Sequence, residues 1–269
     1  NVGTATLTVT GQGNYTGSVS ATFTIEPVYF SWVTCEAVTD QVYTGAAIQP
    51  TLTLSYNERQ LTEGTDYTVT AQNNQHYGYA TLTVTGKGNY TGSFEIGFMI
   101  LQKDFTETAV IEWGADPCVY DGTAKEQAFS VKDGERTLKR GTDYDVLVEN
   151  NTNAGTATVT VTGINNYTGE LTGKFTIQPM SLEGFTVTPA KTSYTYSRAA
   201  HEPLVNVKNG SKKLTAGKDY TVAYANNTNV GTATVTVTGQ GNYTGTAEAT
   251  FTITAKALSS ATAVTPATT

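Results

Sequence analysis

The chain has 269 residues, a formal net charge of −7 and only two cysteines. The acidic balance argues against nucleic acid as a partner and against a polybasic contact with anionic lipid, because both require clustered lysine and arginine. No apolar run approaches the roughly 18 residues of a membrane span, so we expect no membrane insertion of this chain.

One strand pattern occurs four times, beginning at Gly3, Gly78, Gly155 and Gly231. In the third copy, Gly-Thr-Ala-Thr-Val-Thr-Val-Thr-Gly, one set of alternate residues is apolar and the other is threonine. Successive side chains of a strand point to opposite faces, so the pattern predicts a half-buried β-strand with a wet threonine face.

An Asn-Tyr-Thr-Gly turn follows each of these strands, and its tyrosines are spaced by 75, 77 and 76 residues: Tyr15, Tyr90, Tyr167 and Tyr243. This period exceeds the roughly 20–50 residues of solenoid repeats, so each unit should carry its own core. Cys35 and Cys118 do not occupy equivalent positions of the period. We read them as unpaired thiols rather than as a bridge between units, and they are too isolated to build a zinc site.

The period divides the chain into a half repeat at 1–27, repeat 1 at 28–101, repeat 2 at 102–179, repeat 3 at 180–256, and the opening strand of a further repeat at 257–269. Residues 264–269 match 187–192 at a step of 77. Both ends therefore fall inside repeats, and we expect the sequence to be a fragment of a longer array.

Repeat 3 gives the clearest strand pattern, with strands predicted at 184–189, 193–196, 204–207, 219–224, 231–239 and 249–253. Asn209-Gly210 is a strong hairpin signal, and no window shows a helical period. Six or seven short strands per unit predict an all-β chain of antiparallel sandwiches, about 76 residues each. Joints of two or three residues, twice containing proline, predict an extended and fairly stiff rod of beads on a string.

Several motifs carry a more specific resemblance: Tyr43-Thr-Gly45, Tyr120-Asp-Gly122, the Asp-Tyr-Thr-Val strands, Gly-Asn-Tyr-Thr-Gly and the closing Phe-Thr-Ile. Together they resemble the bacterial immunoglobulin-like repeats of the MBG and YDG kind over essentially the whole chain. The resemblance implies tandem modules of large secreted or wall-anchored bacterial surface proteins, often adhesins. Two departures stand out: Arg198 replaces the glycine of Tyr-x-Gly in repeat 3, which puts that turn in doubt, and 75–79 of repeat 1 replaces the usual Thr-Asn-Val-Gly-Thr.

Most recurring residues are explained by packing and turns. We assign core positions to the phenylalanine and isoleucine of each closing strand: Phe23, Ile25, Phe98, Ile100, Phe175, Ile177, Phe251 and Ile253. The Asn-Tyr-Thr tyrosine should plug the end of the sandwich and hydrogen-bond to nearby backbone. Its asparagine suits a turn better than a glycan, although each copy is a sequon: Asn14, Asn89, Asn166 and Asn242. A turn-capping role is favoured over calcium binding for three recurring aspartates: Asp66, Asp143 and Asp219.

No catalytic, cofactor or metal site is predicted. His76 and His201 lie in different repeats without a nucleophile pattern around them. A Lys–Asn isopeptide crosslink would need a lysine in register between repeats, and Lys87, Lys125 and Lys174 have no such counterparts.

The candidate ligand contacts are the aromatic residues that only repeat 1 carries, namely Trp32, His76, Tyr77 and Tyr79, with Tyr29 and Phe30 beside them. Tyr79 takes a threonine position on the wet face of its strand, where an aromatic ring can stack on a sugar or anchor a protein. The interpretation we favour is plainer: Trp32 and Tyr77 belong to the core or pack against a neighbouring unit, and Trp113 does likewise.

We therefore expect a non-catalytic, extracellular structural stalk or spacer of a bacterial cell-surface or secreted protein, an adhesin by resemblance. The first alternative is a module that binds carbohydrate or a host surface protein through the repeat 1 aromatics. The second is an accessory module of a secreted carbohydrate-active enzyme. The half repeat exposes a sheet edge and a core face, which its own missing strands or strand addition from another chain could complete.

Overall fold

The computed structural model describes residues 1–258, so the strand expected from the match at 264–269 lies outside the described residues. Within these residues the chain is all-β, and the single helical element is a short 3-10 helix. Every hydrogen-bonded sheet is formed by strands of one repeat. The fold class predicted from the alternating pattern is confirmed.

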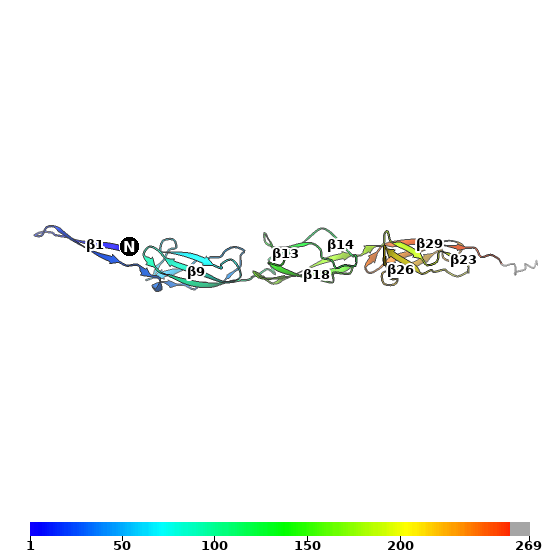
Figure 1. Ribbon diagram of the computed structural model, residues 1–269, viewed down its shortest axis with the longest axis horizontal. Helices are drawn as coiled ribbons and strands as arrows, with labels where there is room; N and C mark the ends of the chain where they lie inside the picture. Colours follow the sequence, from blue (N-terminus) through cyan, green and yellow to red (C-terminus); the bar gives the residue numbers. More distant parts are fainter. Residues whose placement is uncertain (259–269) are drawn as a thin grey trace, which may run out of the picture. The chain divides into compact units, whose positions relative to one another are not determined.

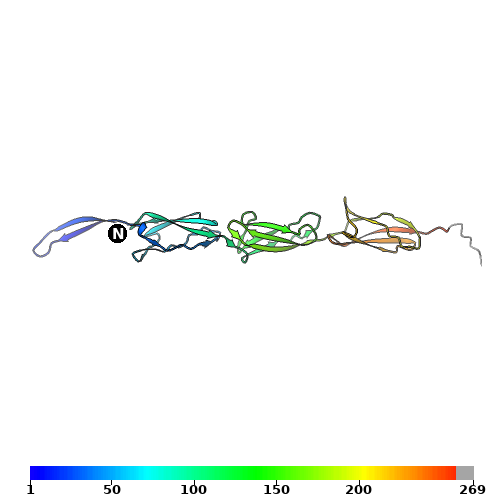
Figure 2. The same cartoon turned by 90° about the horizontal axis from the view of Figure 1, so that it is seen from below.

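The half repeat consists of two antiparallel strands, β1 (Gly3–Thr10) and β2 (Ser18–Ile25), which form an isolated ribbon in both views (Figures 1 and 2). Gly3 pairs with Ile25 and Thr10 with Ser18. Leu7 and Phe23 are 60% and 56% exposed, since no second layer covers this ribbon. The core assignment of Phe23 and Ile25 is therefore wrong for the half repeat, although the sequence pattern is the same as in the full repeats.

Repeat 1 contains nine strands and the 3-10 helix η1. Their bounds are β3 (Val28–Tyr29), η1 (Phe30–Trp32), β4 (Thr34–Cys35), β5 (Gln41–Val42), β6 (Leu54–Tyr56), β7 (Arg59–Gln60), β8 (Tyr67–Gln72), β9 (Gly78–Gly86), β10 (Tyr90–Thr91) and β11 (Ser93–Leu101). A four-stranded sheet has the order β5-β11-β9-β8, and a three-stranded sheet has the order β4-β6-β7. Most pairs are antiparallel, but β5 joins β11 and β3 joins β10 as short parallel pairs.

Repeat 2 repeats this arrangement without the helix. Its strands are β12 (Lys103–Asp104), β13 (Ala109–Trp113), β14 (Cys118–Val119), β15 (Phe129–Asp133), β16 (Arg136–Thr137), β17 (Tyr144–Glu149), β18 (Gly155–Gly163), β19 (Tyr167–Thr168) and β20 (Glu170–Gln178). The sheet orders, β14-β20-β18-β17 and β13-β15-β16, match those of repeat 1. Cys35 and Cys118 are free thiols, and burial together with the nearby Glu36 carboxylate raises the pKa of Cys35.

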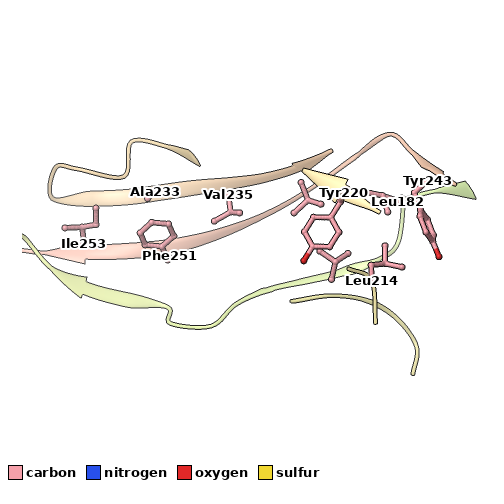
Figure 3. Packing of buried hydrophobic residues seen from close by; sticks show 10 residues of the cluster. Leu182, Leu214, Tyr220, Ala233, Val235, Tyr243, Phe251 and Ile253 are labelled. Atoms are coloured by element: carbon pink, nitrogen blue, oxygen red, sulfur yellow. The ribbon is translucent and has the colours of Figure 1, made fainter. Parts of the chain in front are cut away.

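Repeat 3 has the same plan. Its strands are β21 (Met180–Ser181), β22 (Thr186–Pro189), β23 (Ser193–Thr195), β24 (Val205–Asn209), β25 (Lys212–Lys213), β26 (Tyr220–Ala225), β27 (Gly231–Gly239), β28 (Tyr243–Thr244) and β29 (Thr246–Thr254). Its core joins the apolar face of β27 and β29 to side chains of the smaller sheet (Figure 3). Val235, Phe251 and Ile253 are at most 2% exposed there, which confirms the inward row predicted from the alternation.

The described strands form two compact units. One contains 1–110, 131–145 and 161–171, and the other contains 111–130, 146–160 and the residues from 172 onward. The joint between repeats 1 and 2 (joint 1–2) falls inside the first unit, and the joint between repeats 2 and 3 (joint 2–3) falls inside the second. Each joint is thus part of a compact body and can be described by its own contacts.

Candidate functional site

An asparagine clamp forms joint 1–2. The side-chain Oδ1 of Asn166 accepts a hydrogen bond from the backbone N–H of Tyr77 at 2.8 Å. Its Nδ2 lies 3.1 Å from Nδ1 of His76. The oxygen is already an acceptor, so the amide nitrogen must donate and the His76 Nδ1 must carry a lone pair. One side chain of repeat 2 therefore holds two adjacent residues of repeat 1.

The same clamp occurs at the other joints, using the asparagine of the Asn-Tyr-Thr turn each time. Asn242 accepts from the N–H of Ala154 at 2.8 Å and donates to Asn153 Oδ1 at 3.0 Å. Asn89 accepts from the N–H of Val2 at 2.9 Å and lies 3.4 Å from Asn1 Oδ1. Three of the four sequon side chains are thus occupied by protein contacts, and this favours the structural interpretation over a glycan at those three positions.

A cation between two tyrosines is the second contact at joint 1–2. Arg136 on β16 donates from Nη1 to the Tyr43 hydroxyl at 2.8 Å. Its guanidinium lies 5.5 Å from the Tyr43 ring centre and 5.7 Å from that of Tyr167, and these two rings meet edge to face at 5.5 Å. Such a cation–π arrangement contributes about 0.5–2 kcal/mol, depending on how far it is desolvated.

Lys212 on β25 takes this place at joint 2–3. Its Nζ lies 5.2 Å from the ring centre of Tyr120 and 5.8 Å from that of Tyr243. Hydrogen bonding to Tyr243 raises the pKa of Lys212, against the opposing effect of burial. At joint 1–2, burial raises the pKa of Tyr167 to about 12 even though the Arg136 charge lowers it. Burial also raises the pKa of Tyr243, so Tyr167 and Tyr243 remain protonated well beyond neutral pH.

The joints qualify the prediction for the Asn-Tyr-Thr tyrosines. Tyr90, Tyr167 and Tyr243 are buried, as expected, but Tyr15 of the half repeat is 78% exposed. In Tyr167 and Tyr243 the ring contacts a tyrosine of the preceding repeat, which the sequence interpretation did not anticipate.

The recurring aspartates cap turns, as predicted. Each accepts a hydrogen bond from the backbone N–H four residues earlier, at 2.8–3.0 Å: Thr62 to Asp66, Lys139 to Asp143, and Thr215 to Asp219. Asp66 and Asp143 are also 3.7 Å from the guanidinium groups of Arg59 and Arg136. The second contact links the turn of repeat 2 to the cation of joint 1–2.

The first part of the predicted ligand site is an exposed aromatic pair. Trp32 is 64% exposed, Tyr29 is 58% exposed, and their rings meet edge to face at 6.3 Å. Phe30 between them is buried at 3% against Tyr90 and Phe94. The expectation that Trp32 belongs to the core is wrong, because η1 turns only Phe30 inward. Trp113, by contrast, packs against Phe129 and Phe175 as predicted.

The other predicted contacts lie near the opposite end of β9. Tyr79 is 64% exposed and lies over Gly97, where a Cβ atom would collide with its ring. A hollow of about 370 Å³ is lined by His76, Tyr77, Thr142, Asn165 and Asn166 at joint 1–2. Phe30 contacts Gly86 at the far end of β9, roughly 23 Å from Tyr79 at strand spacing. The structure brings His76, Tyr77 and Tyr79 together and leaves Trp32 apart.

The sequence interpretation missed the joint residues Arg136 and Lys212 and the role of the turn asparagines. A signal was present, because Arg59, Arg136 and Lys212 keep the period as a basic position after each hairpin turn. His76 likewise stands where the other repeats have Asn1, Asn153 and Asn229. Within residues 1–258 no group of three or more His, Cys, Asp or Glu side chains is arranged to hold a metal ion. Those residues also include no helix long and apolar enough to cross a membrane.

Known proteins give little further guidance. No protein family and no curated protein matches the chain. Among solved structures, the protocadherin GammaB4 extracellular domain is similar at 10% identity and a TM-score of 0.23, over 95% of this chain and 54% of its own. Domains 4–9 of surface layer protein SbsC are similar at 14% identity and 0.20, over 83% of this chain and 47% of theirs. The chain thus spans about half the length of these two structures. Such low TM-scores do not bear on function, and the resemblance to MBG and YDG repeats stays a prediction.

Proposed function

We propose that this chain is a non-catalytic spacer array, in which clamped joints set the spacing of whatever the array carries. The observation that supports it most directly is the asparagine clamp, which recurs at three joints with the same two contacts. A joint held by a clamp and a tyrosine-bound cation resists bending more than a bare linker of two or three residues. The resemblance to MBG and YDG repeats supports a secreted or surface-anchored bacterial protein, an adhesin among them.

Small-angle X-ray scattering tests the spacer role on the full chain, with Asn166→Ala and Arg136→Ala combined to weaken joint 1–2. Two lost hydrogen bonds and a lost cation–π contact should cost the joint about 2 kcal/mol, and the distribution of particle lengths should broaden. Asn14→Ala is the matched control, because it removes the same side chain from the exposed turn of the half repeat. A compact parent particle, or equal distributions for parent and double variant, would contradict the proposal.

The second candidate function is recognition of carbohydrate or a host surface protein by repeat 1. The observation that favours it is the exposed pair Tyr29 and Trp32, which stands where repeat 2 has Asp104 and Glu107. Large exposed aromatic rings supply stacking surfaces for sugars and anchors for proteins. Tyr79 and the hollow at His76 and Tyr77 form a separate second surface.

A glycan panel tests this candidate on the full chain. Binding should be lost with Trp32→Ala or with Tyr79→Ala, according to the surface used. Tyr15→Ala serves as the matched control, since Tyr15 is an exposed aromatic outside repeat 1. Silence of the parent chain across the panel would reject carbohydrate, and binding that survives both variants would reject these surfaces.

A further inference from the structure

The glycine of Tyr-x-Gly makes room for the cation of the following repeat. Gly45 and Gly122 have φ of 88° and 92°, in the left-handed region that favours glycine. A Cβ atom added to Gly45 would lie 2.7 Å from Arg136 Nη1, and one added to Gly122 would lie 3.1 Å from Lys212 Nζ. The bare backbone thus borders the place that the cation occupies between the two tyrosines.

Repeat 3 builds the same turn with arginine. Arg198 adopts φ 67°, and the N–H of Tyr196 donates to the Thr254 carbonyl at 2.9 Å, as Tyr43 does to Leu101 and Tyr120 to Gln178. The sequence-based doubt about this turn is therefore wrong for the backbone. Repeat 3 also keeps the two residues that a clamp asparagine would bind. Asn229 and Val230 are equivalent to Asn153 and Ala154, and both are exposed.

Arg198 changes the charge at this end of repeat 3, because the other two repeats have an uncharged glycine here. Its side chain begins at the position that the cation of a following repeat would occupy, and it adds a positive charge beside that position. Two like charges held close together at an interface can cost several kcal/mol, and a lysine that moves away gives up its tyrosine contacts. Lys191, whose Nζ lies 4.6 Å from the Tyr194 ring centre, adds to the positive charge of repeat 3 where the other repeats have Val38 and Ala115.

We propose that the Tyr196–Arg198 end of repeat 3 docks a repeat that carries an acidic residue at the position of Arg136 and Lys212. The partner keeps the turn asparagine, which clamps Asn229 and Val230, and its carboxylate pairs with the Arg198 guanidinium. All three complete repeats of this chain carry a cation at that position, Arg59, Arg136 and Lys212, so a second copy is the wrong partner. The inference rests on the proposed spacer role, because it concerns which module the array accepts at this end.

A designed extension tests it. Residues 1–255 are followed directly by a further copy of 180–258, after Cys35 and Cys118 are replaced by serine. Spin labels on the outer faces of repeat 3 and the added repeat report the distance distribution across the new joint. A second label pair across joint 2–3 gives the reference for a clamped joint.

The unaltered extension, with Arg198 facing the added Lys212, should give a broad distribution. Lys212→Glu in the added copy should narrow the distribution. Arg198→Gly in repeat 3 should also narrow it when Lys212 of the added copy is kept. Combining both changes should restore the broad distribution. Arg198→Gly in repeat 3 does not change the added repeat, so this variant tests the inference even if Lys212→Glu impairs the folding of the added repeat.

An unaltered joint as narrow as joint 2–3, or no narrowing with Arg198→Gly, would overturn the inference and leave the spacer role intact. A broad distribution at joint 2–3 itself would overturn the spacer role, and the inference with it.

Discussion

The ion pair between Lys103 and Asp133 offers the sharpest test of how repeat 2 is stabilised. Lys103 Nζ lies 2.5 Å from Asp133 Oδ2, and the Asp133 side chain is only 4% exposed, against 33% for the lysine. Burial alone would raise the pKa of Asp133, but hydrogen bonds from Lys103 and Thr108 and the charges of Lys103 and Arg136 hold it below its ordinary value. The charged form of the buried Asp133 carboxylate therefore depends on Lys103.

Lys103→Met should destabilise repeat 2 by about 2 kcal/mol. Removing one member of a fully buried pair costs about 3–5 kcal/mol, and the exposed third of this lysine reduces that figure. Repeat 3 supplies the control, because Met180 and Asn209 occupy the equivalent positions. Lys103→Met combined with Asp133→Asn copies that neutral pair and should recover most of the loss.

Hydrogen exchange followed by mass spectrometry is the suitable assay, since it reports each repeat separately in a chain of several cores. Amides around Val131 and Leu138 should exchange about 30-fold faster in the single variant, which is the factor that corresponds to about 2 kcal/mol. Peptides of repeat 3 should not change. The folded pKa of Asp133 is lowered, so its contribution is complete above the ordinary aspartate pKa and is lost as pH falls through the folded value. Equal exchange in parent and single variant at pH 7, or a double variant no better than the single one, would refute the reasoning.

Arg198→Gly should stabilise repeat 3 by about 0.5–1 kcal/mol, because removing the strain of a left-handed arginine outweighs the conformational entropy that glycine adds to the unfolded chain. Hydrogen exchange of the repeat 3 amides measures this stability, and the variant must exchange more slowly than the parent chain. Tyr167 should ionise among the last tyrosines in a spectrophotometric titration, because burial raises its pKa to about 12. Because the folded pKa of Tyr167 is raised, its stabilising contribution to joint 1–2 is complete below pH 10 and is lost as the pH rises toward 12. A Tyr167→Phe chain with the same spectrophotometric titration curve as the parent would contradict this prediction. His76→Ala removes one of the two contacts of Asn166 and should broaden the distances measured across joint 1–2, while His76→Asn, which copies Asn153, should keep them narrow.

The interior of each repeat was predictable because one physical rule governs it. Alternation of period two places Ala233, Val235 and Val237 on one face, and all three are 0% exposed. The turn role of Asp219 followed equally from local chemistry, since a short carboxylate after Gly-Lys readily accepts from nearby backbone. The same alternation failed in the half repeat, where Leu7 and Val9 are exposed. A pattern reports which side chains would face a core, and burial also requires the second layer.

The aromatic residues of repeat 1 show a different limit. Phe30 and Trp32 are both apolar and lie two residues apart, but the first is 3% exposed and the second 64%. A strand would have placed them on one face; the short helix η1 separates them, and no periodicity signals a helix of three residues. Tyr79 was predictable as exposed because it sits within a long strand whose alternation fixes its face.

The joints are hidden from pattern reading for a further reason, since their contacts join residues nearly 90 positions apart and follow no periodicity within a strand. Comparison between repeats does reach them. The Tyr-x-Gly turns of the three repeats share one backbone geometry, but two of them have glycine and the third has Arg198. The three asparagine clamps share one pair of contacts, but one of them contacts His76 where the others contact asparagine. Because the fold is held constant, each such difference isolates the chemistry of a single joint. Substitutions between the repeats of one chain therefore carry information about joints that burial patterns do not contain.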